Sequence, residues 1–224
     1  MKKFFLRLGD MMGLTKKIPR KHLAEFIKKN SCILKTLDIG SGGSPYGSYF
    51  PNRISVDIAP VPGVDIIANA EDLNMFTEGE FGCVLATEVL EHIKNPEKAI
   101  SEFYRVLKKN GKLVLTTRFI FPIHDAPNDY WRFTRYGLEH LLRRFERIEL
   151  TEEVKTLGTI AVLFERIGLQ CETLYFKPLS VLWLIFSKLI EPLSGIITRE
   201  YGDVRHSVDG QHIMTSGYYV VAIK

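Results

Sequence analysis

The chain has 224 residues, of which 46% are hydrophobic and 25% are charged, and its formal net charge is +4. These values are those of an ordinary globular protein with one sizeable buried core. The three cysteines, Cys32, Cys83 and Cys171, form no C-x-x-C pair. This pattern argues against a disulfide framework or a cysteine zinc site and predicts a reducing, cytoplasmic location.

The positive charge is concentrated at the N-terminus. Residues 1–35 carry ten Lys or Arg against only Asp10 and Glu25. We therefore expect a basic helical N-terminal arm over residues 1–35 and a single larger domain over residues 36–224. A solvated surface helix is the simplest interpretation of the arm, and contact with an anionic membrane or a nucleic acid is the alternative. Arg7 and Asp10 interrupt the apolar start, so no signal peptide is predicted.

From Thr36 onward, short apolar runs alternate with helical stretches, which is typical of a parallel sheet covered on both faces. Between the fourth and fifth runs, Asn95 as N-cap and Pro96 at the first helical position predict a helix that ends at Asn110–Gly111. The first five expected strands are Thr36–Ile39, Ile54–Asp57, Val64–Ala68, Cys83–Ala86 and Leu113–Thr117.

The second half of the chain begins with a predicted helix after Thr134 and a sixth strand at Arg147–Thr151. Residues 217–224 form a β-rich run that suits a last strand inserted in the sheet. Residues 155–215 fit this scheme least and are expected to be a helical insertion or lid. The apolar segment 174–197 is too short to span a bilayer, which takes about 20 apolar residues. It suits a helical cover or, alternatively, a helix lying on a membrane surface.

The sequence Leu-Asp-Ile-Gly-Ser-Gly-Gly at residues 37–43 ends the first expected strand in glycines. Glycines let backbone N–H groups approach a ligand closely. Asp57, at the end of the next strand, is an acid of the kind that binds a ribose diol. Together these features predict a nucleoside-containing cofactor. Pro45 stands where a dinucleotide-binding motif has its third glycine, which argues against NAD.

Further motifs follow in order along the chain. Asp38-x-Gly40-x-Gly42 and Asp57 are followed by Asn69-Ala70-Glu71, by Thr87-Glu88-Val-Leu-Glu91-His92 and by Arg105-Val-Leu-Lys-Lys-Asn-Gly-Lys112. Over residues 36–150 this pattern resembles class I S-adenosylmethionine-dependent methyltransferases of the type 11 group. The resemblance implies an α/β fold with a Rossmann-like, doubly wound, seven-stranded sheet. Its strands would be parallel except for the last, and a helical insertion would precede that strand.

The resemblance also implies positions for S-adenosylmethionine, the expected cofactor. Gly40 and Gly42 would line its methionine end, where Asp38 would support the loop or meet the ammonium group. Asp57 would hold the ribose hydroxyls. A sulfonium with an ammonium and a carboxylate suits a pocket that offers carboxylates and backbone N–H groups, because each buried charge needs a partner.

The remaining expected cofactor contacts come from residues that follow the third and fourth expected strands. Asn69, Ala70 and Glu71 would lie along the adenine, and Thr87 and Glu88 would face the cofactor from the fourth strand. The family usually has an aspartate where this chain has Asn69, which keeps a hydrogen-bonding group without its charge.

Candidates for the chemical step lie in residues 124–134, just after the fifth strand. A similar stretch occurs in methyltransferase-like proteins associated with bacterial cell-surface glycan synthesis. We expect His124 to be the general base, with Asp129 or Asp125 as its orienting or proton-accepting partner. The structural alternative is that Asp129 and Arg132 form an ion pair that fixes the loop. His92, by resemblance, is expected to shape a loop rather than to react.

The sequence therefore predicts a cytoplasmic methyltransferase that uses S-adenosylmethionine on a small-molecule or glycan-like acceptor. Two alternatives stay open: a lipid or quinone-type acceptor, and a catalytically silent protein that binds S-adenosylmethionine. No metal site is predicted, and a nucleic-acid partner is not favoured. Peripheral membrane contact is an option for residues 1–30 and 174–197, and the oligomeric state is not predicted.

Overall fold

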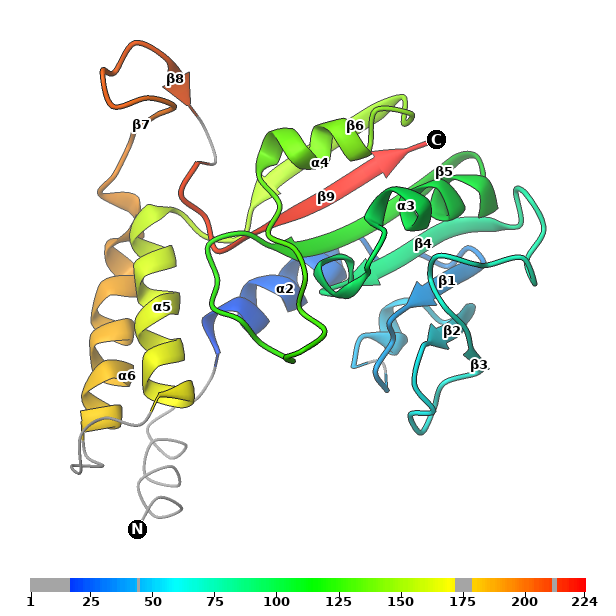
Figure 1. The fold of residues 1–224 in the computed structure, drawn as a ribbon, viewed down its shortest axis with the longest axis horizontal. Coiled ribbons are helices and arrows are strands. Elements are labelled where there is room, and N and C mark those ends of the chain that lie inside the picture. The colour runs from blue at the N-terminus through cyan, green and yellow to red at the C-terminus, as the bar shows by residue number, and fades with distance from the viewer. Residues whose placement is uncertain (1–16, 44, 172–178, 211–212) are drawn as a thin grey trace. The chain divides into compact units, whose positions relative to one another are not determined.

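The computed structural model describes residues 17–43, 45–171, 179–210 and 213–224 (Figure 1). The chain divides into two compact units. The first, the sheet unit, comprises Phe26–Phe119, Ile123–Thr151 and Gly217–Lys224. The second, the helical unit, comprises Glu152–Ser216, Ile120–Pro122 and, at the N-terminus, Met1–Glu25, of which residues 17–25 are described.

The sheet unit contains a seven-stranded sheet in the order β3-β2-β1-β4-β5-β9-β6. The pairs β1–β2, β1–β4, β2–β3 and β4–β5 are parallel, whereas β9 runs antiparallel to β5. The predicted Rossmann-like fold, with the last strand inserted antiparallel, is therefore confirmed. The strands are β1 Thr36–Ile39, β2 Arg53–Asp57, β3 Ile66–Ile67, β4 Phe81–Thr87, β5 Leu107–Arg118, β6 Arg147–Glu152 and β9 Gly217–Ile223.

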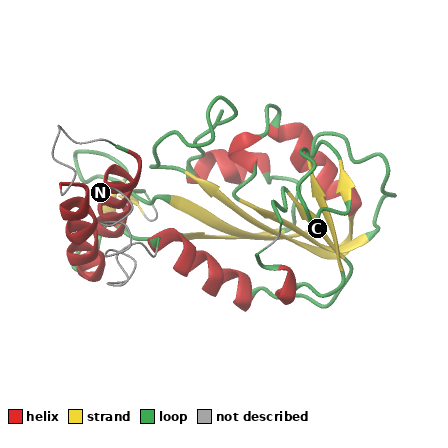
Figure 2. Ribbon diagram, turned by 90° about the horizontal axis from the view of Figure 1, so that it is seen from below, coloured by secondary structure: helices red, strands yellow, loops and turns green. Residues whose placement is uncertain are grey.

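Helices α3 (Pro96–Val106) and α4 (Arg135–Leu141) lie on one side of this sheet (Figure 2). Both begin as predicted, because the Asn95 side chain accepts a hydrogen bond from Lys98 N–H and the Thr134 side chain accepts one from Gly137 N–H. Both contribute apolar side chains to the same core cluster as the strands. Two single 3₁₀ turns, η1 (Gly47–Tyr49) and η2 (Leu90–His92), follow β1 and β4.

The predicted end of α3 at Asn110–Gly111 is wrong. The helix ends at Val106, and β5 already begins at Leu107. The reason is a pairing with the distant C-terminus: Asn110 N–H donates to Lys224 O at 2.8 Å, and Lys224 N–H donates to Gly111 O at 3.0 Å. Asn110 is left-handed, with φ at +60°, but it lies inside a strand rather than at a helix end.

In the helical unit, α5 (Thr156–Gln170) and α6 (Leu179–Ile190) pack side by side (Figure 1). A Cβ on Gly168 would lie 2.9 Å from Ser180 O, so glycine there permits the close approach. The Phe164 and Trp183 rings stack at 5.4 Å. The predicted helical insertion is therefore present. Sequence reasoning did not foresee η3 (Glu191–Gly195) or the small hairpin of β7 (Glu200–Tyr201) and β8 (Asp209–Gly210).

The predicted basic arm is only partly described. Residues 1–16 lie outside the described residues, and α2 (Ile18–Lys29) covers most of the remainder. Of the segment 174–197, residues 174–178 also lie outside them. Within the described part of the chain, none of the helices has the length and apolar character needed to cross a membrane.

Candidate active site

The candidate site lies at one edge of the sheet. Because β1, β2, β4 and β5 are parallel, their carboxyl ends meet at the same edge, and the loops that follow these strands lie near one another. Each predicted site residue except Asp38 lies at the carboxyl end of a strand or in a loop beyond one. Asp38 lies within β1, where it is 2% exposed and where Arg53 Nε approaches its carboxylate to 3.7 Å.

The glycine turn after β1 is left-handed at Gly40, Gly42 and Gly43, with φ at +63°, +50° and +87°. A Cβ on Gly40 would lie 2.4 Å from the Val89 side chain, so only glycine fits there. A Cβ on Gly42 would meet nothing nearer than 3.9 Å, which leaves its exposed side open to a ligand. The Ser41 hydroxyl in this turn is buried and has no hydrogen-bond partner within the described residues.

Asp57 lies at the end of β2 and contacts the glycine turn directly. Its Oδ2 accepts a hydrogen bond from Gly42 N–H at 3.0 Å, and its Oδ1 accepts one from Ala59 N–H at 3.1 Å. The carboxylate is only partly buried, and each oxygen has further lone pairs for other donors. The structure thus brings the predicted ribose-binding acid beside the predicted glycines.

Residues 69–71 form the loop that follows β3. The exposed Asn69 side chain accepts a hydrogen bond from Glu71 N–H at 3.0 Å. Glu71 Oε1 in turn accepts one from Asn95 N–H, at the start of α3, at 3.1 Å. Ala70 packs against the main core. The loop is therefore shaped by its own polar side chains, and Glu71 connects it to α3.

Glu88 follows Thr87 at the end of β4 in a left-handed conformation, with φ at +56°. This conformation is uncommon for a residue with a side chain, and such strain is concentrated at functional sites. Glu88 N–H donates to both the backbone and the side chain of Thr116, and the carboxylate pairs with Arg118, which is 2% exposed. Sequence reasoning missed Arg118, because a single arginine in a strand carries no motif.

His124 and Asp129 come together in the loop after β5. Asp129 Oδ2 accepts a hydrogen bond from His124 N–H at 2.8 Å and lies 3.2 Å from His124 Nδ1. Arg132 donates to both Asp129 oxygens at 2.6 Å and lowers the Asp129 pKa to about 2. Burial lowers the pKa of His124, which favours a neutral imidazole. Asp125 is exposed, with φ at +53°, and its backbone carbonyl accepts a hydrogen bond from Asn128 N–H.

Glu91 and His92, in η2, lie next to His124. The Glu91 side chain is fully buried, and its Oε1 lies 4.0 Å from His124 Nε2. The His92 and His124 rings are 4.8 Å apart between centroids. Sequence reasoning treated Glu91 only as part of a motif and His92 as a loop residue. No sequence pattern connects them to His124, because the two segments meet only in the folded chain.

Comparisons with known proteins agree with this arrangement. The family model for a methyltransferase domain matches residues 37–115. An uncharacterized protein of Methanocaldococcus jannaschii is 31% identical over 157 residues, which cover 64% of this chain and 75% of that protein. The chain belongs to the class I S-adenosylmethionine-dependent methyltransferases.

Two further similarities are more limited. A ubiquinone/menaquinone biosynthesis C-methyltransferase of Haemophilus ducreyi is 35% identical over 71 residues, which cover 32% of this chain and 27% of that enzyme. The crystal structure of an S-adenosylmethionine-dependent methyltransferase from Archaeoglobus fulgidus has a TM-score of 0.58. That structure is 15% identical to this methyltransferase, and the match covers 99% of both chains. At this identity the likeness concerns the fold.

The cofactor of this methyltransferase is S-adenosylmethionine, and the glycine turn suits its methionine end. A Cβ on Gly42 would meet nothing nearer than 3.9 Å, so the turn leaves room for a ligand beside it, and the buried Ser41 hydroxyl has a hydrogen-bonding capacity that the described residues do not use. Asp57 adds an accessible carboxylate next to the turn. These groups match the acceptors and donors that a nucleoside with an amino-acid tail requires.

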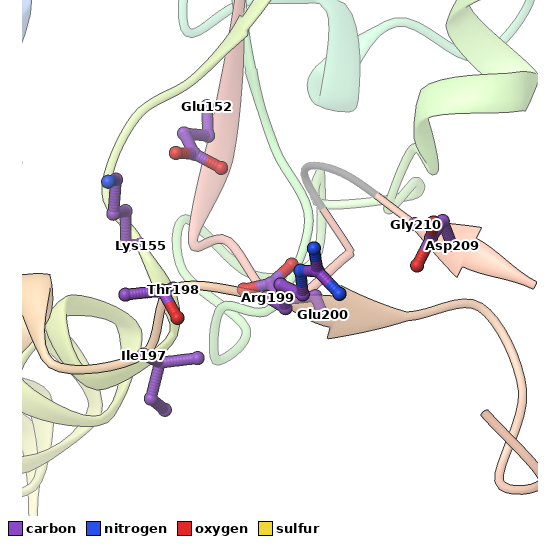
Figure 3. A pocket seen from close by; sticks show the side chains of 8 residues that line it. All are labelled: Glu152, Lys155, Ile197, Thr198, Arg199, Glu200, Asp209 and Gly210. Atoms are coloured by element: carbon purple, nitrogen blue, oxygen red, sulfur yellow. The ribbon is translucent and has the colours of Figure 1, made fainter.

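A separate pocket lies within the helical unit (Figure 3). Its walls carry charges of both signs, including Glu152, Lys155, Arg199, Glu200 and Asp209. It contains none of the residues predicted for the methyltransferase site. Glu200 also serves the local structure, because it accepts hydrogen bonds from Ile213 N–H and Met214 N–H. We assign no chemistry to this pocket.

Proposed function

We propose that this methyltransferase methylates a hydroxyl group of a small-molecule or glycan-like acceptor. The observation that supports this proposal most is the half-buried imidazole of His124, held beside Asp129 in the loop after β5. A general base is useful only when the acceptor must lose a proton, as a hydroxyl must. Methyl transfer otherwise depends chiefly on alignment of the reacting atoms.

The proposed cofactor contacts follow from the same edge of the sheet. Gly40 and Gly42 line the methionine end, and Asp57 accepts hydrogen bonds from the ribose hydroxyls. The positions proposed along the adenine are Asn69, Ala70 and Glu71. Thr87 and Glu88 face the cofactor from the end of β4, and Asp38 supports the turn from within the sheet.

S-adenosylmethionine supplies an electrophilic methyl group on a positively charged sulfur. His124 Nε2 accepts the hydroxyl proton, because Nδ1 faces Asp129. The acceptor oxygen forms its bond to the methyl carbon while the carbon–sulfur bond breaks, and that bond's electron pair remains on sulfur. Asp129 orients the imidazole and stabilises its protonated form, and Arg132 holds Asp129 in place.

The aromatic side chains of the same loop support a glycan-like acceptor. Tyr130 and Trp131 are 40% and 43% exposed, although both are large and partly apolar. The indole N–H of Trp131 donates to Ile93 O at 2.9 Å, which fixes the ring. Exposed, fixed aromatic faces can pack against the apolar faces of sugar rings.

A panel of acceptors tests the proposal. The full chain is incubated with S-adenosylmethionine carrying a labelled methyl group, together with sugars, nucleotide sugars, small phenols or quinone analogues. We expect S-adenosylhomocysteine release and label on the oxygen of a hydroxylated acceptor. Transfer to a quinone ring carbon alone would contradict the hydroxyl proposal and favour carbon methylation, for which the Haemophilus ducreyi relative is named. Cofactor binding without transfer to any class would contradict it as well.

Peripheral membrane contact is a separate part of the proposal. Leu182, Phe186 and Leu189 are 46%, 48% and 61% exposed, and their spacing places them on one face of α6. We expect the full chain to sediment with anionic vesicles and the double variant Phe186→Ser, Leu189→Ser to sediment less. Val204→Ser removes an apolar side chain outside α6 that is even more exposed, at 97%, and serves as control. A full chain that stays in the supernatant would contradict this part.

A further inference from the structure

Three potential metal ligands converge beyond the ends of β4 and β5. Glu91 and His92 lie in η2, directly after β4, and His124 lies in the loop after β5. One carboxylate oxygen of Glu91 and one ring nitrogen of each histidine lie within 4.8 Å of one another. Two imidazoles and a carboxylate are the protein ligands of many catalytic zinc sites and of the 2-His-1-carboxylate iron sites.

Glu91 shows an unused capacity for a cation. Its side chain is fully buried. Its Oε2 accepts a hydrogen bond from Thr117 Oγ1 at 2.8 Å, whereas its Oε1 has no hydrogen-bond partner within the described residues. The Oε1 atom is therefore a buried acceptor aimed toward His124, and the described residues leave it unsatisfied. A bound cation would satisfy it.

Each histidine has a hydrogen-bond acceptor beside its Nδ1, which leaves its Nε2 as the ring nitrogen available to an ion. His92 Nδ1 lies 2.7 Å from Asn128 O, and because a carbonyl only accepts hydrogen bonds, Nδ1 carries the proton. His124 Nδ1 lies 3.2 Å from Asp129 Oδ2, and its Nε2 faces Glu91 Oε1. Histidine ligands of metals typically have a carbonyl or a carboxylate at the other ring nitrogen in this way.

The distances permit coordination after a small adjustment. Two ligands that lie at about 2.1 Å from a tetrahedral ion are separated by about 3.4 Å. The observed distance between Glu91 Oε1 and His124 Nε2 is 4.0 Å. The two imidazole planes are inclined at 74°, so their nitrogens can approach one ion from different directions.

The surrounding charges also favour a cation. The site contains the carboxylates of Glu88, Glu91 and Asp129 and the guanidinium groups of Arg118 and Arg132. Three negative groups against two positive groups leave a formal excess of one negative charge when the histidines are neutral. A divalent ion would therefore meet a site of opposite net charge.

We propose that Glu91, His92 and His124 bind a divalent transition-metal ion such as Zn²⁺ or Mn²⁺, with positions left open for oxygens of the acceptor. The assignment of the acceptor rests on the proposed function, whereas metal binding does not. With the ion in place, His124 Nε2 is a ligand and no longer the base. The ion lowers the pKa of the acceptor hydroxyl, and the hydroxyl proton passes to solvent water.

Metal binding is tested on the full chain without cofactor or acceptor. After dialysis against a chelator, the protein is titrated with Zn²⁺ or Mn²⁺ in a calorimeter. We expect one ion per chain for the wild type and an affinity at least tenfold weaker in Glu91→Gln, His92→Gln and His124→Gln. His140→Gln removes an exposed imidazole of α4 and should leave the affinity unchanged. A wild type that binds neither ion at one per chain would overturn the inference.

Glu91 is buried, so Glu91→Gln could lose ion binding simply because the variant does not fold. His92 is half-buried, and His92→Gln is therefore the variant less affected by this problem. Circular dichroism melting confirms that each variant is folded. Equal ion affinity in wild type, His92→Gln and His124→Gln would overturn the ligand assignment.

Methyl transfer is measured separately, before and after chelation, alongside calorimetric binding of S-adenosylhomocysteine. We expect chelation to abolish transfer, added ion to restore it, and cofactor affinity to stay unchanged. Transfer that persists in the chelated protein would overturn the role of the ion toward the acceptor, with the proposed function intact. Stoichiometric ion binding without transfer to any acceptor would contradict the proposed function and leave the metal site supported.

Discussion

The glycine turn after β1 and the loop after β5 lie at the same edge of the sheet, but they are specified in different ways. In the turn, three glycines within four residues adopt left-handed conformations that side chains rarely allow, so the sequence itself indicates the geometry. In the loop, His124 acquires its chemical setting from Glu91 and His92, which arrive from the end of β4. The cofactor site can thus be predicted from one short sequence motif. The acceptor site cannot, because it is formed by segments that only folding brings together.

This difference should separate the two regions in experiments. Changes in the glycine turn should alter cofactor affinity and leave the chemical step intact once cofactor is saturating. Changes around His124 should alter turnover and leave cofactor affinity intact.

The largest effect is expected for His124→Ala. His124 is the base in the proposed function and a ligand of the ion in the further inference. In either role, loss of the imidazole should lower turnover by about 100-fold or more, which is the range for removal of a general base. The affinity for S-adenosylhomocysteine, measured by calorimetry, should stay within error of the wild type. His140→Ala, an exposed histidine of α4, is the control and should retain full turnover. Unchanged turnover in His124→Ala would mean that the loop plays no chemical part.

Asp57→Ala should weaken S-adenosylhomocysteine binding by about 100-fold, because it removes a charged acceptor for two ribose hydroxyls and each such hydrogen bond contributes about 1.5 kcal/mol or more. The measurement is a calorimetric titration. Asp72→Ala removes an exposed carboxylate outside the turn and should bind as the wild type does. An unchanged affinity in Asp57→Ala would contradict the assignment of Asp57 to the cofactor site.

The Asp129–Arg132 pair should make stability depend on pH. The Asp129 pKa is about 2 in the folded chain against an ordinary 3.8, so its contribution is complete above the ordinary value and is lost as pH falls toward the folded value. Nearly two pKa units correspond to roughly 2 kcal/mol in the free energy of unfolding. Urea unfolding should therefore show Asp129→Asn to be less stable than the wild type at pH 6.

The same comparison at lower pH provides the check. The gap between Asp129→Asn and the wild type should narrow steadily between pH 4 and pH 2, where the wild-type carboxylate also takes up a proton. A gap that stays constant over this window would show that the pair does not perturb Asp129 as the structure indicates.

A smaller effect is expected for Trp131→Phe. The substitution keeps an aromatic face but removes the indole hydrogen bond to Ile93 O, which should lower the free energy of unfolding by about 1 kcal/mol. Because the ring is less firmly held, KM for the acceptor should rise while cofactor affinity stays unchanged. Tyr136→Phe, at an exposed position of α4, is a matched aromatic control. Equal KM values in the two variants would argue against an acceptor platform at Trp131.

The sequence predicted most of the sheet from its apolar runs, and it predicted the starts of α3 and α4 at Asn95 and after Thr134, because these are local signals. It misplaced the end of α3, because the pairing of Asn110 with Lys224 is a contact between distant parts of the chain. The same limitation applies to the site. The glycines and Asp57 could be recognised in order, whereas Arg118 and the convergence of Glu91 with His124 could not. Whether a charged residue is buried, and which groups it contacts, can be established only from the folded structure.

The most direct measurement compares two left-handed glycines. Gly42 and Gly79 have φ at +50° and +66°, and a Cβ on either would meet nothing closer than 3.9 Å in the protein. Gly42→Ala and Gly79→Ala should therefore carry similar backbone strain, but only Gly42 lies in the turn proposed for the cofactor. We predict that calorimetry with S-adenosylhomocysteine will show at least tenfold weaker binding for Gly42→Ala and unchanged binding for Gly79→Ala. Equal affinities in both variants would contradict a cofactor held at the glycine turn.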